Sequence, residues 1–288
     1  MYDIVIVLYQ IKASESPTIQ TLQQILTSNE LPELRQVIVF DNSVSEDNPV
    51  FTDERFVYHF AEGNQGLAKA YNYVWPKSLS KGCHWLITLD QDTSLTNDYF
   101  SAVADEIDQA DKNIAIIAPV IYDKEKQISP VQSNTLRPLH TFLPRGGKIY
   151  YNQVMVINSA AVISLDFLQA IGGYNETFSM DYLDHWLCWR IFQEKKQIKI
   201  LSGALHHQLS VLDYRNSMNT ARYQQILNAE SRFYKDYATE MFTEYKKQLL
   251  LRSMKQIFRG LFPYAGKTLS QYKMISGEKN GDKVTTKK

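Results

Sequence analysis

The chain has 288 residues and is 44% hydrophobic, which suits one large α/β domain or a domain with an appendage. Lys plus Arg and Asp plus Glu each number 31, so no overall charge directs the chain to nucleic acid, and we exclude that class of partner. Cys83 and Cys188 are too few for a disulfide framework and lack metal-site spacing, so we expect two reduced, buried thiols. No run of about 18 apolar residues and no signal peptide is present, so we expect a cytoplasmic chain without a membrane span.

The N-terminal half alternates apolar runs with helical segments. Helices are predicted after Ser16-Pro17, which suits a cap and first turn, after the Gly-containing turn at residues 62–66, and at Asn97–Gln109. Strands alternating with helices imply a largely parallel sheet with right-handed crossovers. The predicted strands are Ile4–Tyr9, Gln36–Phe40, Phe56–Phe60, Trp85–Leu89 and Ile114–Ala118.

The pattern changes after residue 121. Residues 122–148 are rich in Pro, Ser, Arg and Gly and lose their periodicity, which predicts a long functional or mobile loop. From Thr220 to about Gly260 the pattern is helical, and residues 277–288 are expected to be disordered. Between these regions we predict strands at 151–157, 160–164, 198–201 and 205–211, and helices at 166–171 and 181–195.

Two carboxylates, Asp90 and Asp92, directly follow the strand that begins at Trp85. The carboxyl end of a strand is where an open α/β sheet places its ligands. Two aspartates there repel each other unless a cation lies near them, and Mg²⁺ or Mn²⁺ prefers such oxygen ligands and also holds substrate phosphates. About one Asp-x-Asp is expected by chance in this chain, so the motif alone is weak evidence. Its position directly after a buried strand is what favours a metal site.

Three further segments stand in a distinctive order and spacing: Asn64-Gln-Gly66-Leu-Ala68 with Asn72, Ile171-Gly-Gly-Tyr-Asn-Glu176, and Phe178–Arg190. Together they resemble family 2 glycosyltransferases with the GT-A fold, and in particular bacterial rhamnosyltransferases. The resemblance covers about residues 3–235. It implies a GT-A (Rossmann-like) α/β fold, with a mostly parallel sheet flanked by helices and a C-terminal helical extension. The expected catalytic domain is 1–212, with a nucleotide-sugar half at about 1–120 and an acceptor half at about 121–212, followed by a helical region at 213–288.

The resemblance also assigns roles to single residues. It implies an inverting transferase, in which a base activates the acceptor hydroxyl opposite the departing nucleoside diphosphate. Asp184 matches the base, and Asp92, Asp90 and the distal His207 match metal ligands. His206 is the alternative histidine, which faces the other side if this segment is a strand. The residues expected to bind the nucleotide-sugar donor are Tyr9, Asp41, Asn64, Gly66, Ala68, Asn72 and Asp90.

The base segment departs from the family at one position. Leu183 stands where the usual acidic pair has its first member, so Asp184 lacks that acidic neighbour. Asp181, about one helical turn earlier, is expected to support or replace it. Alternatively, both aspartates cap the following helix. Arg190 is expected either to pair with a carboxylate or to lie on the helix surface.

The C-terminal region is basic, with 11 Lys or Arg against two acids between Lys246 and Lys288. This pattern predicts an interfacial helix on an anionic membrane. The alternative is a helix that packs on the catalytic domain or on a second copy in a homodimer. The predicted helix has Leu250, Met254, Ile257, Phe258 and Leu261 on one face and Arg252, Lys255 and Arg259 on the other.

The combined prediction is a metal-dependent glycosyltransferase, a hexosyltransferase that acts on a polyprenyl-linked saccharide acceptor at the inner face of the plasma membrane, in capsule or cell-wall polysaccharide synthesis. The preferred donor is dTDP-L-rhamnose, and the alternatives are UDP-galactose, UDP-galactofuranose and UDP-glucose. A nucleotidyltransferase is disfavoured because no Gly-rich loop follows the first strand. A non-catalytic nucleotide-sugar-binding homologue is the alternative of another class, disfavoured by the intact Asp90, Asp92 and Asp184.

Overall fold

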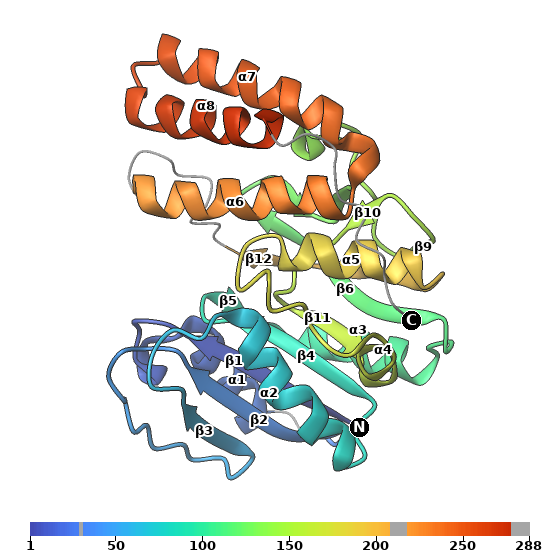
Figure 1. The fold of residues 1–288 in the computed structure, drawn as a ribbon. Helices are drawn as coiled ribbons and strands as arrows, with labels where there is room; N and C mark the ends of the chain where they lie inside the picture. Colours follow the sequence, from blue (N-terminus) through green and yellow to red (C-terminus); the bar gives the residue numbers. More distant parts are fainter. Residues whose placement is uncertain (29–30, 208–217, 278–288) are drawn as a thin grey trace. The chain divides into compact units, whose positions relative to one another are not determined.

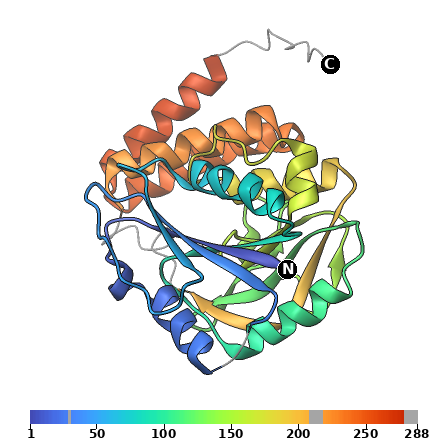
Figure 2. The same cartoon turned by 90° about the horizontal axis from the view of Figure 1, so that it is seen from below.

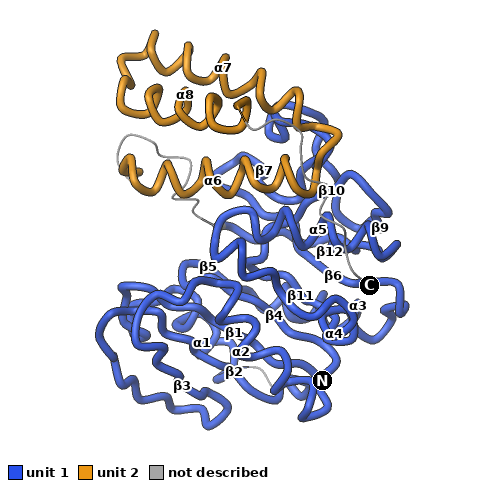
Figure 3. Tube along the Cα trace, in the orientation of Figure 1, with its two compact units in different colours: residues 1–209 blue, residues 210–288 orange. Residues whose placement is uncertain are grey.

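The computed structural model describes residues 1–28, 31–207 and 218–277 (Figure 1). The chain divides into two compact units, residues 1–209 and 210–288 (Figure 3). The domain boundary predicted between residues 212 and 213 lies outside the described residues. Within the described residues, no helix is both long enough and apolar enough to cross a membrane.

A mixed β-sheet organises the first unit (Figure 1). Its first four strands are parallel, in the order β3-β2-β1-β4, and β1 is buried along its whole length. The parallel direction places the carboxyl ends of β1, β2 and β4 at one edge of the sheet, where Leu8 lies beside Asp41 and Val7 beside Asp90. The four strands are β1 (Tyr2–Leu8), β2 (Leu34–Asp41), β3 (Phe56–Phe60) and β4 (Trp85–Asp90).

Beyond β4 the sheet continues through a short antiparallel strand, β11 (Ala161–Ser164), which lies between β4 and β6 (Ile114–Asp123). β12 (Gln197–His207) follows, parallel to β6, and its end pairs with β5 (Thr93–Ser94). The mostly parallel α/β sheet predicted from the sequence is therefore confirmed.

Helices cover both faces of this sheet (Figure 2). α1 (Pro17–Ser28) and α3 (Asn97–Asp108) share one apolar core with alternate residues of β1, β2 and β4. On the other face, α2 (Leu67–Ser80) packs against β1, β4 and α4 (Leu165–Ile171). Three of the helices in this unit begin at hydroxyl caps: Ser16, Thr96 and Ser164 accept hydrogen bonds from the backbone N–H groups of Ile19, Tyr99 and Phe167.

The segment predicted as a long irregular loop contains short strands. β6 runs on to Asp123 and turns into β7 (Lys126–Ser129), which pairs with it, because Ile128 and Val131 bury their side chains here. The strand predicted at 151–157 is wrong for most of its length. Gln153 adopts φ 57°, which interrupts an extended strand, so only β9 (Ile149–Tyr150) and β10 (Val154–Met155) form, the latter paired with β8 (Val131–Gln132).

Two further boundaries differ from the sequence-based expectation. The strands predicted at 198–201 and 205–211 are one strand, β12, with an irregularity between Ile200 and Ala204, and residues 208–211 lie outside the described part. The helix predicted from Asp181 begins only at Leu183, as α5 (Leu183–Gln193), because Tyr182 has φ 64°, outside the helical region.

The second unit consists of α6 (Thr220–Asp236), a 3-10 turn at Thr239–Met241, α7 (Phe242–Phe258) and α8 (Phe262–Gly277). Asn219 caps α6 by accepting a hydrogen bond from the N–H of Arg222. The helical pattern predicted from Thr220 to Gly260 is two helices, because the chain leaves the α-helical conformation between Tyr237 and Met241. α7 ends at a turn in which Gly260 adopts φ 73°, and α8 is an additional helix. The disorder predicted for residues 277–288 falls almost entirely outside the described residues.

Candidate active site

The loop Asp90-Gln91-Asp92 leaves the edge of the sheet at the end of β4. The hydroxyl of Ser16 donates to the carbonyl oxygen of Gln91 at 2.7 Å, and the N–H of Asp90 donates to Ser159 Oγ at 3.2 Å. Both bonds involve backbone atoms of the loop, so they fix its path without occupying a carboxylate oxygen. The carboxylates of Asp90 and Asp92 are partly exposed. This arrangement suits a loop that presents acidic side chains to a ligand.

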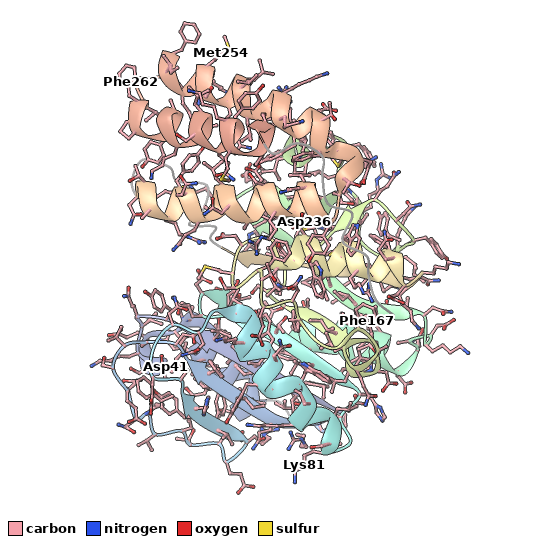
Figure 4. The ribbon with its side chains drawn as sticks, in the orientation of Figure 1. Asp41, Lys81, Phe167, Asp236, Met254 and Phe262 are labelled. Atoms are coloured by element: carbon pink, nitrogen blue, oxygen red, sulfur yellow. The ribbon has the colours of Figure 1, made fainter. Side chains whose placement is uncertain are left out.

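Asp41 ends the neighbouring strand β2 and is fully buried (Figure 4). Its Oδ1 accepts a hydrogen bond from the N–H of Ser43 at 2.8 Å, and its Oδ2 accepts one from the Tyr58 hydroxyl at 2.6 Å. Burial, together with the bond to Asp41, raises the pKa of Tyr58 to about 12, so this hydroxyl stays protonated and donates at neutral pH. Tyr9 lies at the same edge with an exposed ring, and its N–H donates to Gln91 Oε1 at 2.8 Å.

The turn before α2 is fastened to the segment that leads to Asp184. The first two N–H groups of α2, those of Leu67 and Ala68, both donate to the carbonyl oxygen of Ser179, at 2.6 and 3.3 Å. Gly66 has φ 82°, and a Cβ at this position would lie 2.6 Å from the same oxygen. Asn64 Oδ1 accepts a hydrogen bond from the N–H of Gly66 at 3.0 Å, which closes the turn. The requirement for glycine is therefore a close contact as well as a left-handed backbone.

Asn72 connects α2 to the segment after Gly173. Its Oδ1 accepts hydrogen bonds from the N–H of Tyr174 at 2.8 Å and from Trp75 Nε1 at 3.1 Å, and its Nδ2 donates to the carbonyl of Tyr174 at 2.9 Å. These bonds make Asn72 a positioning residue for that segment. Direct donor binding by Asn72 stays a prediction.

Asp184 lies in the first turn of α5 and is partly exposed. Its Oδ1 accepts a hydrogen bond from the backbone N–H of His185 at 2.8 Å and lies 2.9 Å from His185 Nδ1. Oδ2 accepts no hydrogen bond from any residue that the structure describes. The His185 ring stacks on Tyr182 with ring centroids 4.4 Å apart, which holds the imidazole beside the carboxylate. Leu183 is fully buried, so an acid at this position would lose its hydration, which accounts for the missing acidic neighbour.

Tyr71 is a buried tyrosine whose pKa is influenced by both Asp90 and Asp184. It lies in α2, its side chain is fully buried, and its hydroxyl makes no hydrogen bond within the described residues. Burial raises the pKa of Tyr71, and the negative charges of Asp90 and Asp184 raise it further. The charges that contribute to this pKa shift come from carboxylates far apart in sequence, one at the end of β4 and one at the start of α5.

Sequence reasoning missed Tyr71, His185 and the Ser179 carbonyl. A large side chain with a hydroxyl directly after the small residues Ala68 and Ala70 was an available signal for Tyr71. The adjacency of His185 to the expected base was another. No side-chain pattern could identify a backbone carbonyl as the cap of a distant helix.

The two histidines lie at the end of β12, where His206 pairs with Ser94 and His207 with Thr93. The backbone of His207 is therefore beside the residue that follows Asp92, while its side chain lies outside the described part. His206 is exposed, with its ring centroid 6.1 Å from that of Tyr122.

The two remaining supporting residues lie on either side of Asp184. Arg190 pairs with a carboxylate, that of Glu194 one helical turn away, at 2.8 Å, and its side chain is partly exposed. Asp181 is half-buried in the segment before α5. Its supporting role stays a prediction.

The donor groups at this edge fit a hard divalent cation. Among the described residues, no group of three or more His, Cys, Asp and Glu side chains is gathered closely enough to hold a metal. Mg²⁺ sites in nucleotide-using enzymes commonly have one or two carboxylates, with substrate phosphates supplying the other oxygens. Asp90 and Asp92, on a partly exposed loop at the sheet edge, match that donor set.

Comparison with known proteins agrees with this geometry. Residues 3–172 match the family model described as glycosyl transferase family 2. A dTDP-rhamnosyl transferase, RfbF, from Shigella flexneri is 27% identical over 191 residues, which are 64% of this chain and 62% of that protein. The chain therefore spans less than two thirds of the length of this curated relative.

Solved structures resemble the fold. A crystal structure of GalNAc-T7 with UDP, GalNAc and Mn²⁺ aligns with 96% of this chain and 57% of its own, at 14% identity and a TM-score of 0.58. Residues 1–349 of S. aureus TarS align with 97% of this chain and 93% of their own, at 13% identity and a TM-score of 0.48.

Proposed function

This chain belongs to glycosyl transferase family 2, and from that premise we propose that it is an inverting, metal-dependent glycosyltransferase. The observation that carries the proposal is the bonding of the Leu67 and Ala68 N–H groups to the carbonyl oxygen of Ser179, because it joins the donor-side turn to the segment that leads to the base, and a transferase needs its donor near its base. The raised pKa of the buried Tyr71 hydroxyl, to which burial and the charges of Asp90 and Asp184 contribute, supports the same reading.

Asp184 is the proposed general base. Its Oδ2 takes the proton of the acceptor hydroxyl, and the acceptor oxygen attacks the anomeric carbon from the face opposite the nucleoside diphosphate, which leaves with inversion. His185 positions the carboxylate through Oδ1. Asp90 and Asp92, with His207 as a further ligand, would hold Mg²⁺ or Mn²⁺. The ion would stabilise negative charge on the leaving diphosphate.

The donor is proposed to lie across the carboxyl edge of the sheet. Tyr9 and Asp41 are assigned to the nucleotide base, and Asn64, Gly66 and Ala68 to the sugar diphosphate. A dTDP-L-rhamnose donor is preferred because the curated relative from Shigella flexneri is named a dTDP-rhamnosyl transferase. UDP-galactose, UDP-galactofuranose and UDP-glucose are the alternative donors, and a non-catalytic nucleotide-sugar-binding protein is the alternative of another class.

The proposed acceptor is a polyprenyl-linked saccharide of bacterial capsule or cell-wall synthesis. An acceptor on a lipid carrier requires the chain to work on the inner face of the plasma membrane. The excess of basic residues after Lys246 supports this location, and a homodimer is the alternative role of the C-terminal helices. We propose a catalytic domain over residues 1–212, with nucleotide-sugar and acceptor halves that meet near residue 120.

A nucleotide-sugar panel with the Asp92→Ala variant tests this function. In a thermal-shift assay, the preferred donor should raise the melting temperature of the native chain more with Mn²⁺ than without it, because a ligand that binds only the native state stabilises it. Asp92→Ala should abolish this difference and lower transfer at least about a hundredfold, since a charge-stabilising partner of the transition state is lost.

Asp108→Ala is the matched control, because Asp108 is exposed at the end of α3, away from the loop. Full transfer by Asp92→Ala, or undiminished transfer in excess EDTA, would remove the metal from the proposal. Donor binding with neither transfer nor donor hydrolysis would favour the non-catalytic alternative.

A further inference from the structure

α7 exposes several large apolar side chains on the face directed away from its neighbouring helices. Phe258 is 87% exposed. Met254, which is 53% exposed, and Phe262, at the start of α8 and 65% exposed, are labelled in Figure 4. Leu251 and Ile257 are also exposed on α7. We call these five residues, Leu251, Met254, Ile257, Phe258 and Phe262, the apolar ridge.

The opposite face of α7 packs inside the unit and combines buried apolar side chains, Tyr245 and Leu249, with polar ones. Arg252 forms two parallel hydrogen bonds with Glu230 of α6, at 2.7 and 2.8 Å. Gln256 donates to the Tyr223 hydroxyl at 2.8 Å and accepts from the Thr268 hydroxyl at 2.8 Å, so it joins α6 and α8. Of the three cations predicted on the face opposite the apolar residues, Arg252 is paired between helices, whereas Lys255 and Arg259 are exposed.

The ridge is consequently not used to assemble the three helices. Their mutual contacts use polar bonds and buried apolar side chains such as Leu227, Leu249 and Ile275, while the ridge side chains remain on the outer side. A large exposed apolar patch of this kind marks a surface that binds a partner or a membrane.

The charge around the ridge selects the partner. Between Tyr245 and Gly277 there is no Asp or Glu, and Lys255, Arg259 and Lys267 are exposed near the ridge residues in sequence. In a symmetric dimer the same patch meets itself, which would bring these cations together. Anionic lipid head groups instead supply the opposite charge, and the apolar side chains reach the acyl boundary.

We propose that the apolar ridge docks the chain on an anionic membrane surface. The apolar side chains enter the boundary between head groups and acyl chains, and the exposed Lys and Arg contact lipid phosphates. This deepens the proposed function, since a lipid-linked acceptor lies at that surface. The docking itself depends only on residues of α7 and α8 and requires no sugar.

Vesicle co-sedimentation of the full chain tests the docking. Vesicles of phosphatidylcholine alone are compared with an equimolar mixture of phosphatidylcholine and phosphatidylglycerol, at low and high salt. The native chain should bind the mixed vesicles at low salt. Combined Met254→Ser, Ile257→Ser and Phe258→Ser substitutions should weaken this binding at least about tenfold, because apolar burial at the interface is lost.

The matched control removes three exposed apolar side chains from the first unit, by Val50→Ser, Phe142→Ser and Ile149→Ser, and should bind like the native chain. A second variant, Lys255→Gln with Arg259→Gln and Lys267→Gln, should lose the salt-sensitive part of binding while the ridge is kept. A chain truncated after Gly277 should still bind, which separates the ridge from the four lysines beyond that residue.

A fluorescent probe tests insertion directly. Both native cysteines are buried, so a cysteine introduced by Phe258→Cys can be labelled selectively with an environment-sensitive dye. Its emission should shift to the blue with mixed vesicles, whereas the same dye at Val50→Cys should not respond.

Three results would overturn the proposal. They are absence of binding to mixed vesicles at low salt, equal binding by the ridge variant, and a lipid-free dimer that becomes monomeric in the ridge variant. The last would identify the ridge as a homodimer face. Because these assays contain no nucleotide sugar, their failure leaves the proposed transferase activity untouched, and donor hydrolysis in solution tests that activity separately.

Discussion

The two units of this chain distribute polarity in different ways. Residues 1–209 bury apolar side chains such as Ile4, Ile87 and Leu89 on both faces of a sheet, and they gather carboxylates at its carboxyl edge. In residues 218–277, buried polar groups such as Glu230 and Gln271 join the helices beside buried apolar ones, and a row of large apolar side chains on α7 is exposed.

This difference shows that an apolar stripe on a helix does not by itself identify the face that packs. In the first unit, a parallel strand pairs with neighbouring strands and is covered by helices on both faces, so its apolar run is buried. In the second unit, the buried polar groups satisfy one another, because leaving any of them unpaired inside would be costly. The apolar stripe of α7 is then left for something outside the chain.

The largest expected effect is a loss of turnover caused by a substitution in the first unit. Asp184→Asn should lower the turnover number by about 10²–10⁴, because the base is lost, while donor affinity is kept. The melting temperature should change little, since the carboxylate is partly exposed. Steady-state kinetics and donor titration on the same preparations provide the measurement.

Asp166→Asn is the matched control for this variant. Asp166 also lies in the first turn of a helix, α4, and shares the favourable interaction with the helix N-terminus but not the site. If donor affinity fell as steeply as turnover, Asp184 would act in binding and not as the base.

The second effect is a loss of stability confined to the helical unit. Arg252→Met leaves Glu230 buried without its partner, and it should destabilise the unit by about 3 kcal/mol, the lower end of the range for buried pairs because Arg252 is partly exposed. All four tryptophans, Trp75, Trp85, Trp186 and Trp189, lie in the first unit. The urea midpoint measured by far-UV circular dichroism should therefore fall, while the midpoint measured by tryptophan fluorescence should stay the same.

The double variant Glu230→Met and Arg252→Met should recover most of the lost stability, since both charges are removed together. A shift of the tryptophan transition by Arg252→Met alone would contradict the separation of the two units. Truncation before α7 is a poorer experiment, because it removes the partner of Glu230 together with the ridge.

The sequence predicts the first unit better than the second for a physical reason. The strands beginning near Ile4, Phe56 and Trp85 are marked by apolar runs that only a buried strand explains, and their parallel order follows from the helices between them. The turn at Tyr182 and the interruption at Gln153 arise from positive φ angles, which neither residue type predicts. The pairing of β7 with β6 depends on which distant apolar residues cover it.

The site shows the same limit. Asp90 and Asp92 are identifiable because their position after a strand determines where they lie. Asn72 is a conspicuous polar residue, but its bonds to Tyr174 and Trp75 depend on tertiary packing. Met254 and Ile257 likewise point outward because the opposite side of α7 directs Arg252 toward Glu230. No local sequence pattern specifies that ion pair.

The smallest expected effect is on the outer face of α7, and it tests the comparison most directly. Ile257→Ser should lower the free energy of unfolding by only about 1 kcal/mol, because the side chain is already 48% exposed in the folded chain. Leu249→Ser, on the same helix but fully buried, should cost at least about 2 kcal/mol through lost apolar burial. Both values come from urea unfolding followed by far-UV circular dichroism, without lipid. If Ile257→Ser destabilised the chain as much as Leu249→Ser, the apolar ridge would already be covered in solution. The contrast between the two units, which depends on the exposed apolar face of α7, would then not hold.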